Sequence, residues 1–151
     1  MEIITANIQD VPELLELQYK AFEGVANALN WENCPNLMQT LDEAYSEFNN
    51  YKTYKILSDN NKIIASVRGD IIENSLHISR LMVLPEYQGK GLGTLLLRNI
   101  ENDMPHYRAW LNTCKQLKGN VYLYTREGYK PFKHEKINSH LTRVFMGKGE
   151  K

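Results

Sequence analysis

The chain has 151 residues, of which 42% are hydrophobic and 24% charged, a balance typical of one globular domain with a buried core. Lys plus Arg equals Asp plus Glu at 18 each, so charge gives no reason to expect a nucleic-acid or membrane partner. No apolar stretch approaches the roughly 20 residues of a membrane-spanning helix, and the N-terminus does not resemble a signal peptide. We therefore expect a single cytoplasmic domain over residues 1–151.

The cysteine content points to the same compartment. Cys34 and Cys114 are the only cysteines, too few for a disulfide framework and without CxxC spacing. Two free thiols fit a reducing environment. No cluster of His, Cys, Asp or Glu has the spacing of metal ligands, so no metal is expected.

The first part of the chain predicts a short strand and two helices. Residues 2–5 read as the strand, and apolar residues then recur at helical spacing from Val11 to Phe22. Gly24 is interpreted as the cap that ends this helix. Residues 25–39 are expected to be irregular, and a capping-box pattern at Thr40 begins the second helix.

Alternating β-branched residues predict three strands joined as an antiparallel meander, over residues 52–58, 63–72 and about 76–84. A glycine-rich turn leads into a helix that stops before Pro105. The rest of the chain predicts a strand, a helix and a terminal hairpin, over residues 107–113, 118–127, 130–137 and 141–146. This order predicts an α+β fold with one mixed, mostly antiparallel sheet flanked by about four helices.

The glycine-rich turn is the most informative segment. It joins a strand to a helix and contains Gly89, Gly91 and Gly93. Glycine has no Cβ, so the backbone of such a turn can approach a ligand closely. Its amides lie at the positive end of the helix dipole, which favours a pyrophosphate. The Walker A spacing does not match, and the dinucleotide fingerprint would need glycine at Thr94. A purely structural turn is the alternative.

Two motifs together resemble the GNAT superfamily of N-acetyltransferases. The turn from Gln88 to Gly93 matches the family signature [Q/R]-x-x-G-x-[G/A], and the strand before it ends in Val-x-Pro-x-Tyr. The segment from Asn120 to Tyr129 resembles a second family pattern, N-x-x-L-Y-x-x-x-G-[F/Y]. The close resemblance runs from about residue 75 to residue 129, with both motifs in the usual order and separation.

The resemblance implies an enzyme that moves the acetyl group of acetyl-CoA directly to a primary amine of a small molecule or peptide. In this family the pantetheine arm lies along the strand before the turn, which implies backbone contacts at Met82 and Val83. An amide near Met82 would polarise the thioester carbonyl. The pyrophosphate is implied to bind main-chain amides of Gln88, Gly89, Lys90, Gly91, Leu92, Gly93 and Thr94.

The same resemblance assigns two further residues. Tyr124 matches the family tyrosine that protonates the departing thiolate, and its alternative is aromatic packing. Asn120 matches a position that contacts CoA, with a helix N-cap as the alternative.

The general base is less clearly marked. His77 lies where some family members carry a histidine base, and an imidazole titrates in a suitable range. The two-residue strand period places positions 77, 79, 81 and 83 on one face. A histidine satisfied at the sheet surface is the alternative, and Glu73 in the preceding turn fits the role less well.

Acceptor contacts in the family usually come from the first two helices, their loop and the terminal hairpin. This implies four candidates by position, Phe22, Trp31, Tyr45 and Arg68. The segment 25–39 is interpreted either as a pocket lid or as a satellite hydrophobic cluster. At least a weak homodimer is expected.

Three other functions stay open. The chain could be an acyl-CoA-binding sensor without turnover, although an intact Tyr124 favours the transferase. A nucleotide-binding regulatory domain lacks its phosphate motif, and a thioester hydrolase lacks an evident nucleophile or carboxylate pair.

Overall fold

The computed structural model describes residues 2–149, whose strands form one sheet in the order β1-β2-β3-β4-β5-β7-β6. Neighbouring strands are antiparallel except β4 and β5, which run parallel. The strands are β1 (Ile3–Thr5), β2 (Lys52–Leu57), β3 (Ile63–Ile72), β4 (Ser75–Val83), β5 (Arg108–Cys114), β6 (Lys130–Lys136) and β7 (Thr142–Gly149). The α-helices are α1 (Val11–Leu29), α2 (Pro35–Met38), α3 (Leu41–Phe48), α4 (Leu92–Asp103) and α5 (Lys118–Arg126). The predicted α+β class and mixed sheet are confirmed.

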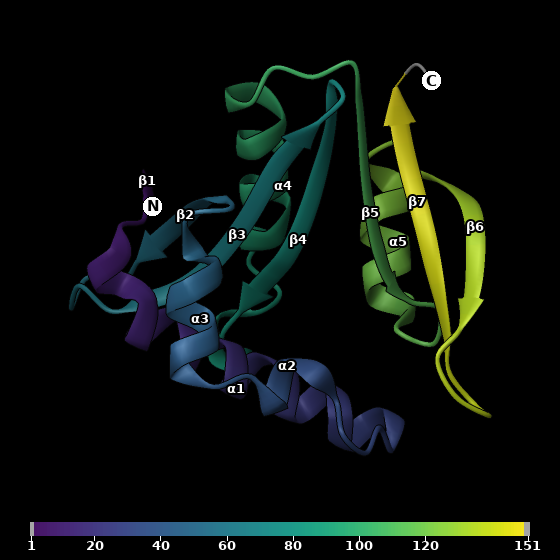
Figure 1. Cartoon of the computed structure of the whole chain (residues 1–151), viewed down its shortest axis with the longest axis horizontal. Helices are drawn as coiled ribbons and strands as arrows, with labels where there is room; N and C mark the ends of the chain where they lie inside the picture. The colour runs from purple at the N-terminus through teal and green to yellow at the C-terminus, as the bar shows by residue number, and fades with distance from the viewer. Residues whose placement is uncertain (1, 150–151) are drawn as a thin grey trace.

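Helices cover both faces of the sheet, with α4 on one face of β3 and β4 and with α1 and α3 on the other (Figure 1). On α4, Leu96, Leu97 and Ile100 are completely buried. Gly69 on β3 leaves room for this contact, because a Cβ there would lie 2.8 Å from Ile100 Cδ1. Burial of such side chains contributes about 1.5–3 kcal/mol each, so it fixes α4 against the sheet.

Helix α1 is longer than the sequence predicted. Gly24 lies inside it, and the helix continues to Leu29 and ends at Asn30, which has a left-handed φ of 51°. The amide of Trp31 then donates to the carbonyl of Ala26 at 2.9 Å, which closes the end of the helix. The predicted end at Gly24 was therefore wrong, because a buried Ala26 extends the apolar face beyond it.

The segment 25–39 is accordingly less irregular than predicted, since it contains the last turn of α1 and the short helix α2. The capping box that begins α3 is confirmed. The Thr40 hydroxyl accepts from the Glu43 amide at 3.2 Å, and Glu43 Oε1 accepts from the Thr40 amide at 2.8 Å.

Strand β4 contains a β-bulge in its second half. Arg68 on β3 pairs with Ser79, whereas Ser66 pairs with Met82, so β4 has one residue more than β3 between these pairs. Arg80 in the bulge has a φ of 49°, which costs a non-glycine residue about 1–2 kcal/mol. Such local strain is typical of functional sites.

The bulge changes which side chains share a face. His77 and Ser79 lie opposite Asp70 and Arg68, on the same face as Met82. Leu81 lies on the other face, where its Cδ2 is 3.8 Å from the place of a Cβ on Gly93. The prediction that positions 77, 79, 81 and 83 share one face was wrong, because one inserted residue reverses the alternation.

Strands β4 and β5 are paired only at their beginnings. Pairing runs from Ser75 to His77 on β4, and the strands then diverge (Figure 1). The second half of β4 is therefore hydrogen-bonded on its β3 side alone, which leaves backbone groups free on the other side.

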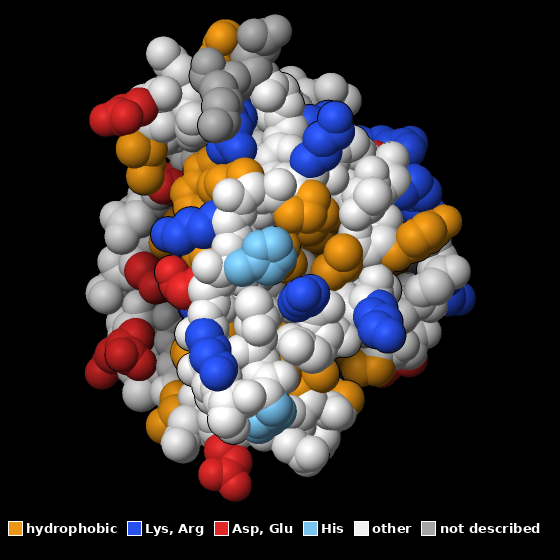
Figure 2. All heavy atoms as spheres, turned by 90° about the vertical axis from the view of Figure 1, so that its right-hand side faces the viewer, with side chains coloured by type: hydrophobic (Ala, Val, Ile, Leu, Met, Phe, Trp, Pro, Cys, Tyr) orange, Lys and Arg blue, Asp and Glu red, His pale blue; other side chains and the backbone are white. Residues whose placement is uncertain are grey.

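The outer edge of the sheet is β6, on which every residue is exposed. Figure 2 views this side of the molecule and shows Lys, Arg and His side chains around hydrophobic ones. The Arg108 guanidinium lies 4.5 Å from the Phe132 ring centroid, a cation–π contact.

None of the described helices is long and apolar enough to cross a membrane.

Candidate active site

Two clefts meet between the diverging strands. The first, here called the glycine cleft, has a volume of about 570 Å³ and is lined by the glycine turn and α5. The second, the aromatic cleft, has a volume of about 430 Å³ and lies between the end of α1, strands β3 to β5 and β7. Leu81, Asn120 and Tyr124 line both clefts, so these residues mark the place where the clefts join.

The glycine turn presents a series of free amides. Gly89 and Gly91 have φ values of 77° and 81°, which glycine adopts without strain, and no atom lies within 4 Å of a Cβ built on either. Within residues 2–149, the amides of residues 89–91 donate to no backbone carbonyl. Residues 92–94 form the first turn of α4, so their amides have no acceptor inside the helix. This cradle fits a pyrophosphate.

The open edge of β4 continues from this turn. The Leu84 amide donates to the Ile64 carbonyl at 2.9 Å, so the alternation of an antiparallel ladder turns the Val83 amide and carbonyl away from β3. Gln88 Nε2 donates to that carbonyl at 3.3 Å. Met82 is paired with Ser66, so its backbone groups face β3. An extended ligand would therefore meet the backbone of Val83 and Leu81.

Tyr124 on α5 stands at the junction of the clefts. Its side chain is only 6% exposed and packs edge-on against Tyr129, with ring centroids 6.1 Å apart. Burial raises the pKa of Tyr124 to about 12. The phenol is therefore protonated at neutral pH and can donate a hydrogen bond into either cleft.

His77 lies in the floor of the aromatic cleft. Its ring stacks on Trp110 at 4.1 Å, and its Nδ1 lies 3.3 Å from Asp70 Oδ1. Burial lowers the pKa of His77, and the nearby Asp70 only partly opposes this shift, so the neutral imidazole predominates near neutral pH. Within the described residues, two buried atoms have no hydrogen-bond partner, His77 Nε2 and Asp70 Oδ1. The 3.3 Å between His77 Nδ1 and Asp70 Oδ1 is therefore an electrostatic contact rather than an aligned hydrogen bond.

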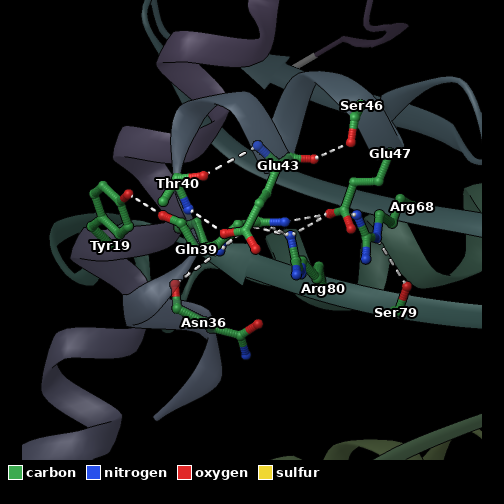
Figure 3. A network of polar contacts seen from close by, with 11 residues as sticks. Tyr19, Asn36, Gln39, Thr40, Glu43, Ser46, Glu47, Arg68, Ser79 and Arg80 are labelled. Atoms are coloured by element: carbon green, nitrogen blue, oxygen red, sulfur yellow. Dashed lines mark hydrogen bonds and ion pairs between the residues drawn. The ribbon is translucent and has the colours of Figure 1, made fainter. Parts of the chain in front are cut away.

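A network of polar side chains borders the aromatic cleft (Figure 3). Glu47 Oε1 accepts from Gln39 Nε2 at 2.7 Å, Arg68 Nη1 at 2.8 Å and Arg80 Nη1 at 3.1 Å. Burial opposes the ionisation of Glu47, but the bonds from Arg68 and Gln39 and the charges of both arginines outweigh it and hold its pKa below the usual value. Arg80 Nη1 also donates to Gln18 Oε1 at 2.8 Å. The network ties α1 and α3 to strands β3 and β4.

The sequence profile of the Acetyltransferase (GNAT) family matches residues 12–129, more than half of the chain. The chain belongs to this family. Enzymes of the GNAT family use acetyl-CoA as the acyl donor and need no metal. No curated protein sequence matches the chain.

Solved GNAT structures share the fold over almost the whole chain. PaiA N-acetyltransferase from Thermoplasma acidophilum, in complex with coenzyme A, has a TM-score of 0.78 at 19% identity, covering 99% of this chain and 98% of that one. Ribosomal-protein-alanine N-acetyltransferase from Brucella melitensis has a TM-score of 0.78 at 16% identity, with 99% and 100% covered. A phosphinothricin acetyltransferase from Sinorhizobium meliloti, in complex with AcCoA, has a TM-score of 0.77 at 17% identity, covering 97% of this chain and 86% of that one.

Most residues predicted to bind the GNAT donor line the glycine cleft, namely Val83, Gln88, Gly89, Gly91, Leu92, Gly93, Thr94 and Asn120. Met82 and Lys90 are not among the lining residues. The backbone of Met82 pairs with Ser66 on β3, and Lys90 has only its free amide in the turn to offer a ligand. The N-cap alternative for Asn120 was wrong. Leu117 occupies the N-cap of α5, and Asn120 Nδ2 donates to Thr113 Oγ1 at 3.3 Å inside the first turn.

Three of the four acceptor candidates, Phe22, Trp31 and Arg68, line the aromatic cleft. Tyr45 does not; it is exposed on α3. Tyr51 takes a position in the cleft instead, with its ring 3.8 Å from the Arg68 guanidinium. The segment 25–39 contributes Val25, Trp31, Pro35 and Asn36 to the cleft wall, and its interpretation as a lid or as a satellite hydrophobic cluster stays a prediction.

Sequence reasoning missed several charged residues of the site. Arg126 lines the glycine cleft and donates to Thr94 Oγ1 at 3.0 Å, where its charge faces the pyrophosphate cradle. Its place within the second GNAT motif was the available signal. Arg80 and Arg143 line the aromatic cleft, and only the three-dimensional bulge and the β7 hairpin bring them there.

Proposed function

We propose that this chain, as a single domain over residues 1–151, transfers the acetyl group of acetyl-CoA to a primary amine of an unidentified small molecule or peptide. The observation that carries the proposal is the junction of the two clefts at Tyr124. One cleft offers a pyrophosphate cradle and an open strand edge, and the other is large enough for a small acceptor. Direct transfer across this junction needs no covalent intermediate with the protein.

The donor would lie along the glycine cleft. Acetyl-CoA supplies a thioester carbonyl and a thiol leaving group. Backbone groups of Val83, and Leu81 in place of Met82, would bind its pantetheine arm, because these groups face the open edge. The free amides of residues 89–94 would hold the pyrophosphate, with Arg126 beside them.

Tyr124 would act at the leaving sulfur. In the overall reaction a C–N bond forms, the C–S bond breaks and one amine proton ends on the thiol. A phenol with a pKa of about 12 is a weaker acid than a thiol with a pKa of roughly 8.5. Tyr124 would therefore donate a hydrogen bond to the sulfur while the C–S bond breaks, and would not end as a phenolate. The proton that it gives to the sulfur would be replaced by the proton that the acceptor amine loses.

His77 is the proposed base, acting on the acceptor amine. Its lowered pKa keeps the imidazole neutral, the form that accepts a proton. Because Nε2 is shielded in the described arrangement, the ring must turn away from Trp110 before Nε2 can meet the amine or a water molecule that carries its proton. The geometry therefore supports Tyr124 more directly than His77.

Two finer expectations accompany the proposal. Both cysteines are free and buried, which fits the predicted cytoplasmic location. The expected weak homodimer stays a prediction, and sedimentation showing only monomer at high concentration would contradict it.

Release of free thiol from acetyl-CoA tests the proposed function directly. The purified chain should release thiol when incubated with acetyl-CoA and a panel of primary amines, and the acetylated amine should appear in equal amount by mass spectrometry. Thiol release without any acetylated amine would indicate hydrolysis and would contradict the proposal.

A further inference from the structure

The charged side chains that line the aromatic cleft are all of one sign. Arg68 and Arg80 lie in its floor and Arg143 in the wall formed by β7. No Asp or Glu is among the described residues that line the cleft. Since the chain as a whole has zero net charge, this distribution is a local property of the cleft.

The carboxylates behind these arginines do not fully compensate them. Arg68 and Arg80 share one oxygen of a single carboxylate, Glu47. Arg143 contacts Glu135 at 3.3 Å, but that side chain is 47% exposed, so solvent weakens the pair. Asp70 faces His77 and does not line the cleft. Glu47 therefore neutralises one of the two guanidinium charges in the floor of the cleft, and no bonded carboxylate in the described part of the chain neutralises the other.

The two floor arginines also keep donors unused. Within residues 2–149, no hydrogen bond engages Nη2 of Arg68, nor Nε or Nη2 of Arg80. These atoms are not among the buried groups without a partner, so solvent or a ligand reaches them. The side chains are only 15% and 19% exposed, so an anion there would meet donors with little competing water.

These guanidiniums are held in place before any ligand arrives. Arg68 stacks on Tyr51 and donates through Nε to Ser79 Oγ at 3.2 Å. Arg80 is fixed by its bonds to Gln18 and Gln39 at 2.8 Å each. Because the network has already ordered both side chains, a carboxylate would bind with a small entropic cost.

The structure assigns to this cleft an acceptor of the amino-acid class, whose amine is accompanied by a carboxylate that Arg68 and Arg80 bind. The apolar walls formed by Phe22, Trp31 and Phe145 would take an apolar or aromatic side chain of that acceptor. A polyamine would bring only positive charge to a positive floor. This inference rests on the proposed acetyltransferase function and narrows its acceptor.

The test compares matched pairs of acceptors in the thiol-release assay. Each pair is an amino acid and its α-amide, such as phenylalanine and phenylalaninamide, which differ in the carboxylate alone; spermine serves as the polyamine. We expect kcat/KM to be about tenfold or more higher for the acid of the preferred pair, the size expected of a charge-assisted hydrogen bond. Equal use of acid and amide, or preference for amide or spermine, would overturn the assignment.

Three substitutions at two positions locate the effect. Arg68→Gln should reduce the acid-over-amide ratio to near one mainly through KM for the acid, and Arg68→Lys should restore part of it. Arg98→Gln, which removes an exposed guanidinium on α4 outside both clefts, should leave the ratio unchanged. A ratio that survives Arg68→Gln would show that another group binds the carboxylate and would overturn the assignment to Arg68.

Binding measured without turnover separates this inference from the proposed function. The sequence contains two tryptophans. Trp31 lines the cleft and Trp110 stacks on His77 in its floor, so tryptophan fluorescence reports occupancy of the cleft. The acid should change this fluorescence at lower concentration than the amide, with or without CoA. Failure of acetyl-CoA to bind would refute the proposed function, whereas no acid-selective signal in a protein that binds acetyl-CoA would refute the acceptor class.

Discussion

Tyr124 shows how one side chain acquires a role from its surroundings. The sequence contains nine tyrosines, and three of them lie close together on or beside α5. Tyr122 is 67% exposed, and Tyr129 is buried with its hydroxyl donating to Glu101. Only Tyr124 of these three lines both clefts, which is why the motif position and the geometry lead to the same residue.

Tyr124→Phe should reduce kcat by about 100-fold, in the lower range for loss of general acid catalysis, because the phenyl ring fills the same space without the hydroxyl. Affinity for acetyl-CoA should change little, as calorimetry can check. Tyr122→Phe is the matched control and should retain activity. An unchanged kcat in Tyr124→Phe would remove this residue as the proton donor.

His77 should shape the pH dependence of the reaction. Only the neutral imidazole accepts a proton, so kcat/KM should rise with pH as His77 loses its proton. Because burial lowers the pKa of His77, the midpoint of this rise should lie below the ordinary histidine value of about 6.5. His77→Gln should abolish the rise, while His134→Gln on exposed β6 should not. An identical pH profile in His77→Gln would show that His77 is a bystander.

The elements of the fold were predictable to different degrees. Strands β2 and β3 were predicted almost to the residue, because alternation of β-branched side chains is a local signal. The bulge at Arg80 was not, since nothing in the local pattern distinguishes an inserted residue from a regular one. That single residue decides that Leu81 rather than Met82 faces the open edge. The network around Glu47 joins residues far apart in the chain and has no sequence signature.

The length of α1 can be tested through Gly24. The structure places this glycine inside the helix, exposed and with no atom within 4 Å of an added Cβ. Gly24→Ala should therefore stabilise the protein by about 0.5–1 kcal/mol, because alanine has less conformational freedom to lose. Thermal and denaturant unfolding would measure this. A loss of stability would instead support a helix that ends at a left-handed Gly24.

The glycine turn can be tested at Gly91, with Gly93 as the control. Gly91 is the N-cap of α4 and has a φ of 81°, and no atom lies within 4 Å of an added Cβ. Gly91→Val should weaken acetyl-CoA binding by about tenfold or more, because its side chain would crowd the pyrophosphate cradle. Gly93, the second residue of α4, stands where the family signature also accepts alanine, so Gly93→Ala should leave the affinity nearly unchanged. Unchanged affinity of Gly91→Val in calorimetry would show that the ligand does not approach this turn.

The whole molecule explains why the two clefts join where they do. The parallel pair β4–β5 is held at one end by three residue pairs and splayed at the other. Helix α4 covers one face beside the opening and α1 covers the other, so a donor and an acceptor reach the opening from different sides. Family membership followed from two sequence motifs, and the order of helices and strands along the chain followed from the periodicity of apolar residues. The charge of the acceptor cleft required the assembled fold, because its arginines come from β3, β4 and β7.

The central claim is that the glycine cleft binds acetyl-CoA, and calorimetric titration of the purified chain tests it most directly. Acetyl-CoA and CoA should bind saturably at one site per chain, and NAD and ATP should not compete at equal concentration. Absence of acetyl-CoA binding, or tighter binding of NAD or ATP, would contradict the account of residues 88–94.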